Sequence, residues 1–533
     1  MFEDRSLAAL YPTAALGVAE PIRPEEHPAS LLVDGRVRQP ASRDLWLPVY
    51  SRVGVRAGEA IKPVLLGYQP DVGADDIAET LAAAERSWSG GSGSWPSASI
   101  EDRIAAVERF SAKLTDCAER IAELLMYEIG KPLAAARSEV SRSVEYIKAT
   151  IAELRRIANG PIYSGTIGAT TYHARDSLHP LGKVLCVAPF NYPINEFLTT
   201  IIPALLVGNV VIAKTPRFGV LANQLLAKAF AECFPAGVVA LLPGDGRIVL
   251  PAVMAAKHID VLGNPKGEID VLAFIGSEQA AHAILTAHPT PSFVHKILGL
   301  GAKNAAVVLP GANVESAATK LVKGALGFNG QRCTAEKIVF APEGGEGDAL
   351  VAALVEKANA LTVGMPSEAN VAITPLPEHN KLDTMWGFLN NALEAGARLA
   401  NEDGGRGYFS IMRPAIVDGI TAAMRLCHEE QFGPIVPVMR YKRLDEVVAW
   451  HHRSPYGQQA GVHGADDDAR RWLVATLATD VARININDVC QRGPDTFGFS
   501  AADKSGFGTL SIELALRAFS RAVITQSPEL SAI

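Results

Sequence analysis

Short apolar runs alternate with Ala-rich segments of helical periodicity from Lys183 onward. The runs are KVLCVAPF, NVVIAK, VVALLPG and IDVLAFIG, and helical segments such as VLANQLLAKAFAECF separate them. Strands that alternate with helices are typical of a parallel sheet in α/β proteins. A second series begins with AAVVLP and KIVFAP, so the pattern predicts two α/β domains.

The pattern before Lys183 is different. Residues 1–48 are Pro-rich and irregular apart from a candidate strand in SLLVDGRV. About 90 residues with helical texture follow directly, as in DDIAETLAAAERSW and from Glu101 to Tyr146. GGSGSWPSAS between these helices is a loop by composition, and HIDVLGNPKGEID has the character of a surface insertion. The tail from Asp503 has a Gly-rich turn and then a helix and a strand.

Length and charge narrow the classes of protein. A chain of 533 residues is too long for one core, and its net charge of −7 with no basic block argues against nucleic-acid binding. A locally positive pocket for phosphorylated substrates is still compatible with that charge. The longest apolar run, 201–213, is too short to cross a membrane, and the N-terminus has no leader pattern, so we expect a cytoplasmic protein.

The six cysteines lie far apart without CxxC spacing, and the histidines form no metal-like pair. This spacing argues against a zinc site and against a disulfide framework, so we expect no metal. Cys333 is the candidate nucleophile, because GALGFNGQRCTAEKIVF places it between a Gly/Asn turn and a β-branched run, with Arg332 beside it. Buried packing is the commoner role of a lone cysteine, and this context alone does not exclude it.

Three further segments carry candidate chemistry. Asn191 in VAPFNYPIN follows a strand and has a side-chain amide suited to an oxyanion, although an ordinary turn residue before Pro193 fits equally well. Lys214 and Arg217 end the strand of VIAKTPRFG, at a position suited to a nucleotide's ribose and phosphates. The alternative is that they form a solvated basic turn. Gly276 and Ser277 open a helix, and a helix N-terminus attracts phosphate.

Taken in order, six motifs resemble the aldehyde dehydrogenase superfamily. They are PFNYP at 189–193, Lys214, F-x-G-S at 274–277, GQRCT at 330–334, EEQFGP at 429–434 and KSGFG at 504–508, within a likeness from about Glu101 to Thr525. The segments FNGQRCTAEK, SEVSRSVEYI, APFNYPIN and QRGPDTFGF are similar to the non-phosphorylating, NADP-dependent glyceraldehyde-3-phosphate dehydrogenases in particular.

The resemblance implies an α/β fold with a Rossmann-like cofactor domain, an α/β catalytic domain and a small β-arm for oligomerisation. The expected boundaries are 1–154 and 180–298 for the NADP-binding domain, 299–487 for the catalytic domain with Cys333, and 155–179 and 488–533 for the arm. The arm would join subunits into a homodimer or homotetramer.

The resemblance also assigns roles. Cys333 would attack a small-molecule aldehyde and form a thioester, with Asn191 and the Cys333 amide stabilising the oxyanion. Glu430 would hold the nicotinamide ribose, and Phe432 would pack nearby. Arg217 stands where many NAD-preferring relatives have a glutamate, and a guanidinium favours the 2′-phosphate of NADP, although NAD is not excluded.

The positions that would bind a substrate phosphate are Arg142, Tyr192, Arg332 and Arg492. Three guanidinium groups in one pocket would be costly without a balancing anion, which favours a short phosphorylated aldehyde such as glyceraldehyde 3-phosphate.

One departure from the family pattern concerns the last step. Relatives that release a free acid carry ELGGK, whose glutamate activates water, whereas this chain has GLGAK with Gly299 at that position. General-base help is worth roughly 10²–10⁴ in rate. Three alternatives follow from this departure. In the first, another carboxylate or a water chain replaces the glutamate, and in the second, coenzyme A accepts the acyl group as in acylating semialdehyde dehydrogenases. In the third, the chain is a turnover-deficient NADP-binding or structural homologue.

Overall fold

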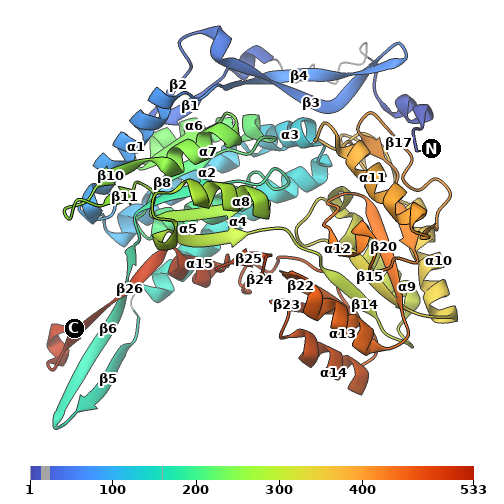
Figure 1. Cartoon of the computed structure of the whole chain (residues 1–533). Coiled ribbons are helices and arrows are strands. Elements are labelled where there is room, and N and C mark those ends of the chain that lie inside the picture. The colour runs from blue at the N-terminus through green and yellow to red at the C-terminus, as the bar shows by residue number, and fades with distance from the viewer. Residues whose placement is uncertain (1, 14–23, 159) are drawn as a thin grey trace.

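Two central sheets organise the computed structural model, which describes residues 2–13, 24–158 and 160–533. The larger sheet has eight strands (Figure 1). In spatial order they are β2 (Arg36–Arg38), β1 (Leu31–Val33), β9 (Val239–Leu242), β8 (Val210–Lys214), β7 (Lys183–Val187), β12 (Val271–Ile275), β13 (His295–Gly299) and β25 (Gly506–Phe507). The five central strands run parallel, as the alternation predicts, and the outer ones are antiparallel.

Alternate residues of this sheet feed two cores. In β7, Val184 and Cys186 belong to one core, and Leu185 and Val187 to the other. The helices that supply the first core are α2 (Ile100–Asp116), α3 (Ala118–Ile129), α4 (Leu133–Ile157), α5 (Asn195–Leu206), α6 (Val220–Cys233) and α15 (Ile512–Ala518). The second core is covered by α1 (Ala74–Trp88), α7 (Gly246–Ala255) and α8 (Glu278–Ala287).

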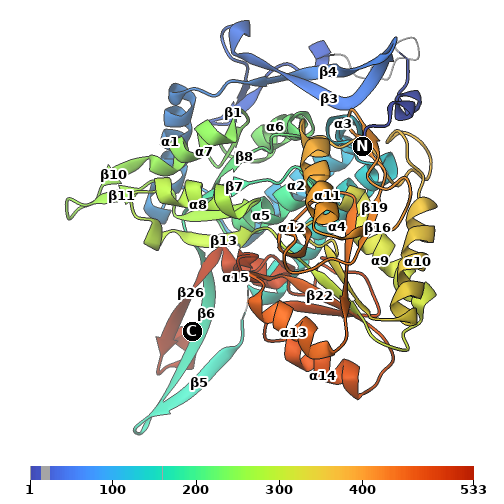
Figure 2. The ribbon, with the colours of Figure 1, turned by 45° about the vertical axis from the view of Figure 1, so that its right-hand side comes forward.

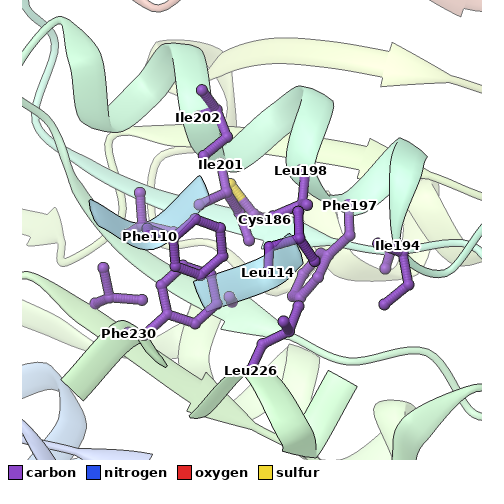
Figure 3. Close-up of a cluster of buried hydrophobic side chains, with 14 of the residues drawn as sticks. Phe110, Leu114, Cys186, Ile194, Phe197, Leu198, Ile201, Ile202, Leu226 and Phe230 are labelled. Carbon is purple, nitrogen blue, oxygen red and sulfur yellow. The ribbon is translucent and has the colours of Figure 1, made fainter. Parts of the chain in front are cut away.

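Aromatic stacking fills the first core. The rings of Phe110 and Phe230 stack with centroids 4.3 Å apart, and Figure 3 shows the sulfur of Cys186 beside Ile201 in the same cluster. Burial raises the pKa of Cys186 to about 12, so its thiol behaves as an apolar packing group.

The second sheet has seven strands, parallel except at one edge. Their order is β16 (Arg398–Leu399), β19 (Ala415–Asp418), β20 (Ile435–Tyr441), β15 (Ile338–Pro342), β14 (Ala305–Val308), β22 (Gln459–His463) and β23 (Arg483–Ile486). One face carries α9 (Val314–Leu326) and α10 (Gly345–Asn359). The other carries α11 (Lys381–Glu394), α12 (Arg425–His428), α13 (Leu444–Arg453) and α14 (Asp468–Leu477).

The expected helical texture directly after residue 48 is wrong. The chain there forms a hairpin of β3 (Trp46–Ala57) and β4 (Ala60–Pro70). Residues of β3 alternate in burial, with Val49, Ser51 and Val53 inside and Tyr50 outside, and this period of two favours a strand. The ribbon packs on α3 and α6 and lies across the top of both halves in Figures 1 and 2.

A three-stranded sheet projects from the body (Figures 1 and 2). It consists of β5 (Ile162–Ile167), β6 (Thr170–Pro180) and β26 (Ser520–Ser527), and it exposes Tyr163, Ile167 and Ile524. Within 488–533 only β26 lies in this sheet, because β25 pairs with β13 and β24 (Ala502–Asp503) pairs with β21 (Tyr456–Gly457).

The segment that resembles an insertion is a short hairpin of β10 (Lys257–Ile259) and β11 (Pro265–Gly267), whose tip exposes Val261 and Leu262. The strands β17 (Gly407–Tyr408) and β18 (Ile411–Met412) form a separate two-stranded sheet. In the described ranges, no helix has the length and apolarity that crossing a membrane requires.

Candidate active site

A cavity of about 880 Å³ collects most of the residues that the sequence singles out. Its walls come from loops after β7, β8, β12 and β13 of the first sheet and from the Cys333 and Glu430 loops of the second. Of the predicted site residues, those that line it are Arg142, Asn191, Tyr192, Arg217, Gly276, Ser277, Arg332, Cys333, Glu430, Phe432 and Arg492. Lys214 does not line it.

Cys333 follows a turn whose backbone is left-handed. Phe328, Asn329 and Gly330 have φ values of 51°, 56° and 71°. The Asn329 side chain secures the turn by bonding both to the Thr374 carbonyl, at 3.1 Å, and to the Thr374 N–H, at 2.9 Å. A Cβ at Gly330 would lie 2.5 Å from the Gly433 carbonyl oxygen, so only glycine fits there.

Two buried side chains hold the carbonyl of Cys333. Asn304 Nδ2 and Lys337 Nζ each donate to this oxygen at 2.8 Å. The same Nζ lies 3.0 Å from Glu430 Oε1, which links the Cys333 loop to the Glu430 loop. These bonds position the thiol, which is partly exposed in the cavity.

The surroundings of Cys333 favour the protonated thiol over the thiolate. Burial first, and then the negative charge of Glu196, raise the pKa of Cys333 above its ordinary value, while Lys337 opposes them. The thiolate is the reactive form, so attack requires loss of this proton.

The Asn191 segment is fixed by a buried ion pair. Lys131 is paired with Glu139 and donates to the Asn191 carbonyl at 2.8 Å. The second Glu139 oxygen accepts the N–H groups of Ile194 and Asn195 at the start of α5. Asn191 Nδ2 donates to the Gln331 carbonyl at 2.8 Å, two residues before Cys333. The amide predicted to hold an oxyanion is therefore tied to the nucleophile's own loop.

The arginines of the cavity are largely neutralised by the chain itself. Arg142 donates twice to Asp495, at 3.0 and 2.6 Å, and Arg492 pairs with Glu196 and lies 3.6 Å from Asp495. Arg142 and Arg492 are therefore balanced by carboxylates of the chain, so the expectation that their charge requires a bound anion is wrong. Arg332 forms no ion pair in the described part of the chain and donates to the Gly324 carbonyl. Its charge nevertheless acts on the buried carboxyl of Glu336, where it opposes the rise in pKa that burial causes. Each of the three arginines therefore has a carboxylate of the chain in its neighbourhood.

The opposite end of the cavity is aromatic and basic. Arg217 is exposed above the Phe218 ring, at 5.3 Å, with no ion-pair partner among the described residues. Ser277 caps α8 by accepting from Ala280 N at 3.2 Å, which confirms the predicted helix start. Lys214 is buried, its Nζ donates to the Thr215 carbonyl at 2.7 Å, and burial lowers its pKa to about 8. A role for Lys214 with a nucleotide stays a prediction.

Gly299 lies on the cavity wall at the end of β13. A Cβ built there would meet only Ile275, at 3.4 Å, which is ordinary contact. A Cβ therefore fits at this position, so crowding around a Cβ does not explain the glycine.

Several supporting residues escaped the sequence reasoning. Lys131, Glu139, Asn304 and Lys337 position Cys333 and Asn191, and Glu196 places a carboxylate in the cavity. Glu139, Asn304 and Lys337 stand inside or beside quoted motifs, so proximity to SEVSRS, GAKN and GQRCT was the available signal. Among the residues described, no cluster of three His, Cys, Asp or Glu side chains suits a metal ion.

Comparison with known proteins agrees with this geometry. The model of the aldehyde dehydrogenase family matches residues 58–524. The NADP-dependent glyceraldehyde-3-phosphate dehydrogenase of Streptococcus equinus is 32% identical over 460 residues, covering 85% of this chain and 91% of that protein. The sulfoacetaldehyde dehydrogenase of Neptuniibacter caesariensis is 28% identical, covering 78% of this chain and 88% of that one.

A solved structure gives the same result. The NADP-dependent glyceraldehyde-3-phosphate dehydrogenase of Bacillus halodurans C-125, complexed with NADP, superposes with a TM-score of 0.84 at 30% identity and covers 94% of this chain and 99% of that one. Because the family model, the curated relative and the solved structure each match most of the chain, this chain belongs to the aldehyde dehydrogenase family.

Proposed function

We propose that the protein oxidises a short, anionic aldehyde with NADP through a thioester on Cys333, and that glyceraldehyde 3-phosphate is the first substrate to test. The observation that carries the proposal is that Cys333 and Asn191 share one cavity with an unpaired Arg217 at its far end. The relatives at 32% and 30% identity are NADP-dependent glyceraldehyde-3-phosphate dehydrogenases.

The residues of the cavity fit a nicotinamide dinucleotide. Arg217 offers an unpaired guanidinium to a 2′-phosphate, Gly276 and Ser277 line the cavity at the start of α8, and Glu430 and Phe432 lie near Cys333. When bound, the cofactor supplies a hydride acceptor. Cys333 Sγ would form a bond to the aldehyde carbon, and Asn191 Nδ2 and the Cys333 N–H would donate to the oxyanion. The thiol proton would pass to solvent, and the aldehyde hydrogen would leave as a hydride to the cofactor, so that the acyl group remains on Cys333 as a thioester.

The proposal of an anionic substrate rests on Arg332, which lines the cavity and forms no ion pair within the described part of the chain, whereas Arg142 and Arg492 are paired with Asp495 and Glu196. Two relatives are also named for anionic aldehydes, glyceraldehyde 3-phosphate and sulfoacetaldehyde. A phosphate or a sulfonate would pair with the Arg332 guanidinium. We also propose that the sheet of β5, β6 and β26 joins subunits into a homodimer or homotetramer.

The test is a rapid-mixing assay of the whole protein with NADP. We expect a burst of one NADPH per site with glyceraldehyde 3-phosphate, a weaker response with sulfoacetaldehyde, and the weakest with neutral propanal of similar length. A burst that is equal for propanal would overturn the anionic substrate, and no burst with any aldehyde would overturn the enzymatic proposal.

Coenzyme A remains a competing acyl acceptor, because Gly299 leaves the usual base position empty. Repeating the assay with coenzyme A separates the two acceptors. Turnover in buffer alone supports water, and turnover only with coenzyme A supports acyl transfer.

A further inference from the structure

Glu196 is a carboxylate in the lining of the cavity that contains Cys333. It lies in the first turn of α5, where its N–H donates to the Tyr192 carbonyl at 3.1 Å. The turn that carries Asn191 and Tyr192 therefore also aims Glu196. The residue is 8% exposed, and that exposure faces the cavity that it lines.

One Glu196 oxygen is engaged and the other is available. Oε2 accepts from Arg492 Nη1, which fixes the carboxylate, while Oε1 has no hydrogen-bond partner among the described residues and is not sealed from solvent. An ionised carboxylate only accepts hydrogen bonds, so Oε1 is suited to a water molecule that donates to it.

The other two carboxylates of the cavity wall are paired with lysines, as Glu196 is with an arginine. Glu378 is paired with Lys381 at 2.7 Å, and Glu430 is paired with Lys337 at 3.0 Å near Phe432. Of the three, Glu196 has the strongest named electrostatic effect on Cys333, because its charge ranks directly after burial among the causes that raise that thiol's pKa. Glu196 also belongs to the turn of Asn191, whose side-chain amide bonds to the loop of Cys333.

We infer that Glu196 is the general base that hydrolyses the Cys333 thioester in place of the residue missing at Gly299. The inference rests on the proposed function. Glu196 Oε1 takes a proton from water as the water oxygen forms a bond to the acyl carbon. The C–S bond then breaks, the electron pair returns to Cys333 Sγ, the acid leaves, and the proton passes from Glu196 to the thiolate or to solvent.

The experiment separates formation of the thioester from its hydrolysis. The full-length protein is mixed with NADP and glyceraldehyde 3-phosphate, and both the NADPH burst and the steady-state rate are recorded. We expect Glu196→Gln to keep a burst of one NADPH per site while its steady-state rate falls about 100-fold or more. Intact-protein mass spectrometry should then find the acyl group accumulated on the variant.

Hydroxylamine provides the decisive readout. It attacks a thioester without help from a base, so it should restore the steady-state rate of Glu196→Gln to within about tenfold of the original protein with hydroxylamine. A merely structural role for Glu196 would reduce the burst itself, and hydroxylamine would not repair it. Either that result or an unchanged steady-state rate in Glu196→Gln overturns the inference.

Glu196→Asp covers the case in which loss of charge beside Arg492 prevents folding. It keeps the ion pair but withdraws the carboxylate by one methylene, so the steady-state rate should fall about tenfold with the burst intact. An unchanged rate contradicts the inference. Glu108→Gln makes the same change at an exposed carboxylate on α2, outside the cavity, and should keep both phases.

Failure of the proposed function looks different. If the original protein gives no burst, the thioester itself is absent and the proposed function fails. If it gives a burst and then turns over only with coenzyme A, the thioester stands and the role of Glu196 is overturned.

Discussion

The Cys333 carbonyl accepts a hydrogen bond from Lys337 Nζ at 2.8 Å, so an ammonium held by the protein orients the loop of the nucleophile. Asn304 donates to the same oxygen at 2.8 Å. With its carbonyl fixed from two sides, Cys333 has little freedom to turn away from Asn191, and the loop is prepared for attack before any ligand arrives.

Replacing the nucleophile tests this geometry first. Cys333→Ala should abolish the NADPH burst, because no thiolate remains to attack the aldehyde. The burst amplitude measured by stopped-flow absorbance checks this. Cys117→Ala, at the junction of α2 and α3, removes another partly exposed thiol and should leave the burst intact. A retained burst in Cys333→Ala would refute the assignment.

The reactivity of Cys333 should rise steeply with pH. Burial and the charge of Glu196 raise its pKa, so the reactive thiolate is a small fraction at neutral pH and grows as the pH rises toward that pKa. In the free protein, iodoacetamide should alkylate Cys333 about tenfold faster per pH unit between about pH 7 and 9. Peptide mass spectrometry measures the rate, and a plateau below pH 8 would contradict the raised pKa.

Cofactor preference should depend on Arg217. Arg217→Glu replaces an unpaired guanidinium by a carboxylate that repels a 2′-phosphate, so kcat/KM for NADP relative to NAD should fall at least about 100-fold. Steady-state kinetics with both cofactors gives the ratio. Lys228→Glu makes the same change of charge at an exposed site on α6 and should not alter the ratio.

A glutamate at position 299 should find room. The Cβ of Gly299→Glu would meet only Ile275, at 3.4 Å, and a second base would speed hydrolysis wherever that step limits turnover. We expect a severalfold higher steady-state rate with an unchanged burst. Gly301→Glu is the contrasting variant: its Cβ would lie 2.8 Å from Glu430 Oε2, so it should reduce activity. No gain in Gly299→Glu would mean that hydrolysis is not limiting.

The Lys131–Glu139 pair should be costly to break from one side. Lys131→Met leaves the Glu139 carboxylate buried without its cation, and breaking a buried pair in this way destabilises a protein by about 3–5 kcal/mol. Urea unfolding measures the loss. The double variant Lys131→Met/Glu139→Gln removes both charges and should recover part of it; equal losses in the two variants would argue against an ion-pair effect.

The sequence predicts the parallel sheets well, because buried parallel strands such as β7 and β8 are continuous apolar runs that stand out between helices. It does not predict β3 and β4, because glycine and proline interrupt the alternation of their residues. These two strands also pair only with each other, and the ribbon they form lies across both halves of the molecule. Local pattern identifies an element more readily than the surface on which it packs.

The candidate site divides in the same way. Cys333, Asn191 and Arg217 stand in short motifs with recognisable chemistry, and the structure brings them to one cavity. The pairing of Arg492 with Glu196 joins residues 296 positions apart in the chain, and no local pattern reports such a contact. Sequence reasoning therefore counted the positive charges of the pocket and missed the negative ones.

The eight-stranded sheet takes its outer strands from opposite ends of the chain, with β1 and β2 before residue 39 and β25 at Gly506–Phe507. During synthesis this sheet therefore cannot be complete until Gly506 and Phe507 have left the ribosome. The Cys333 and Glu430 loops leave the ribosome before β25, which forms one edge of the eight-stranded sheet. A nascent chain truncated before β25 would therefore carry the nucleophile while that sheet is still incomplete.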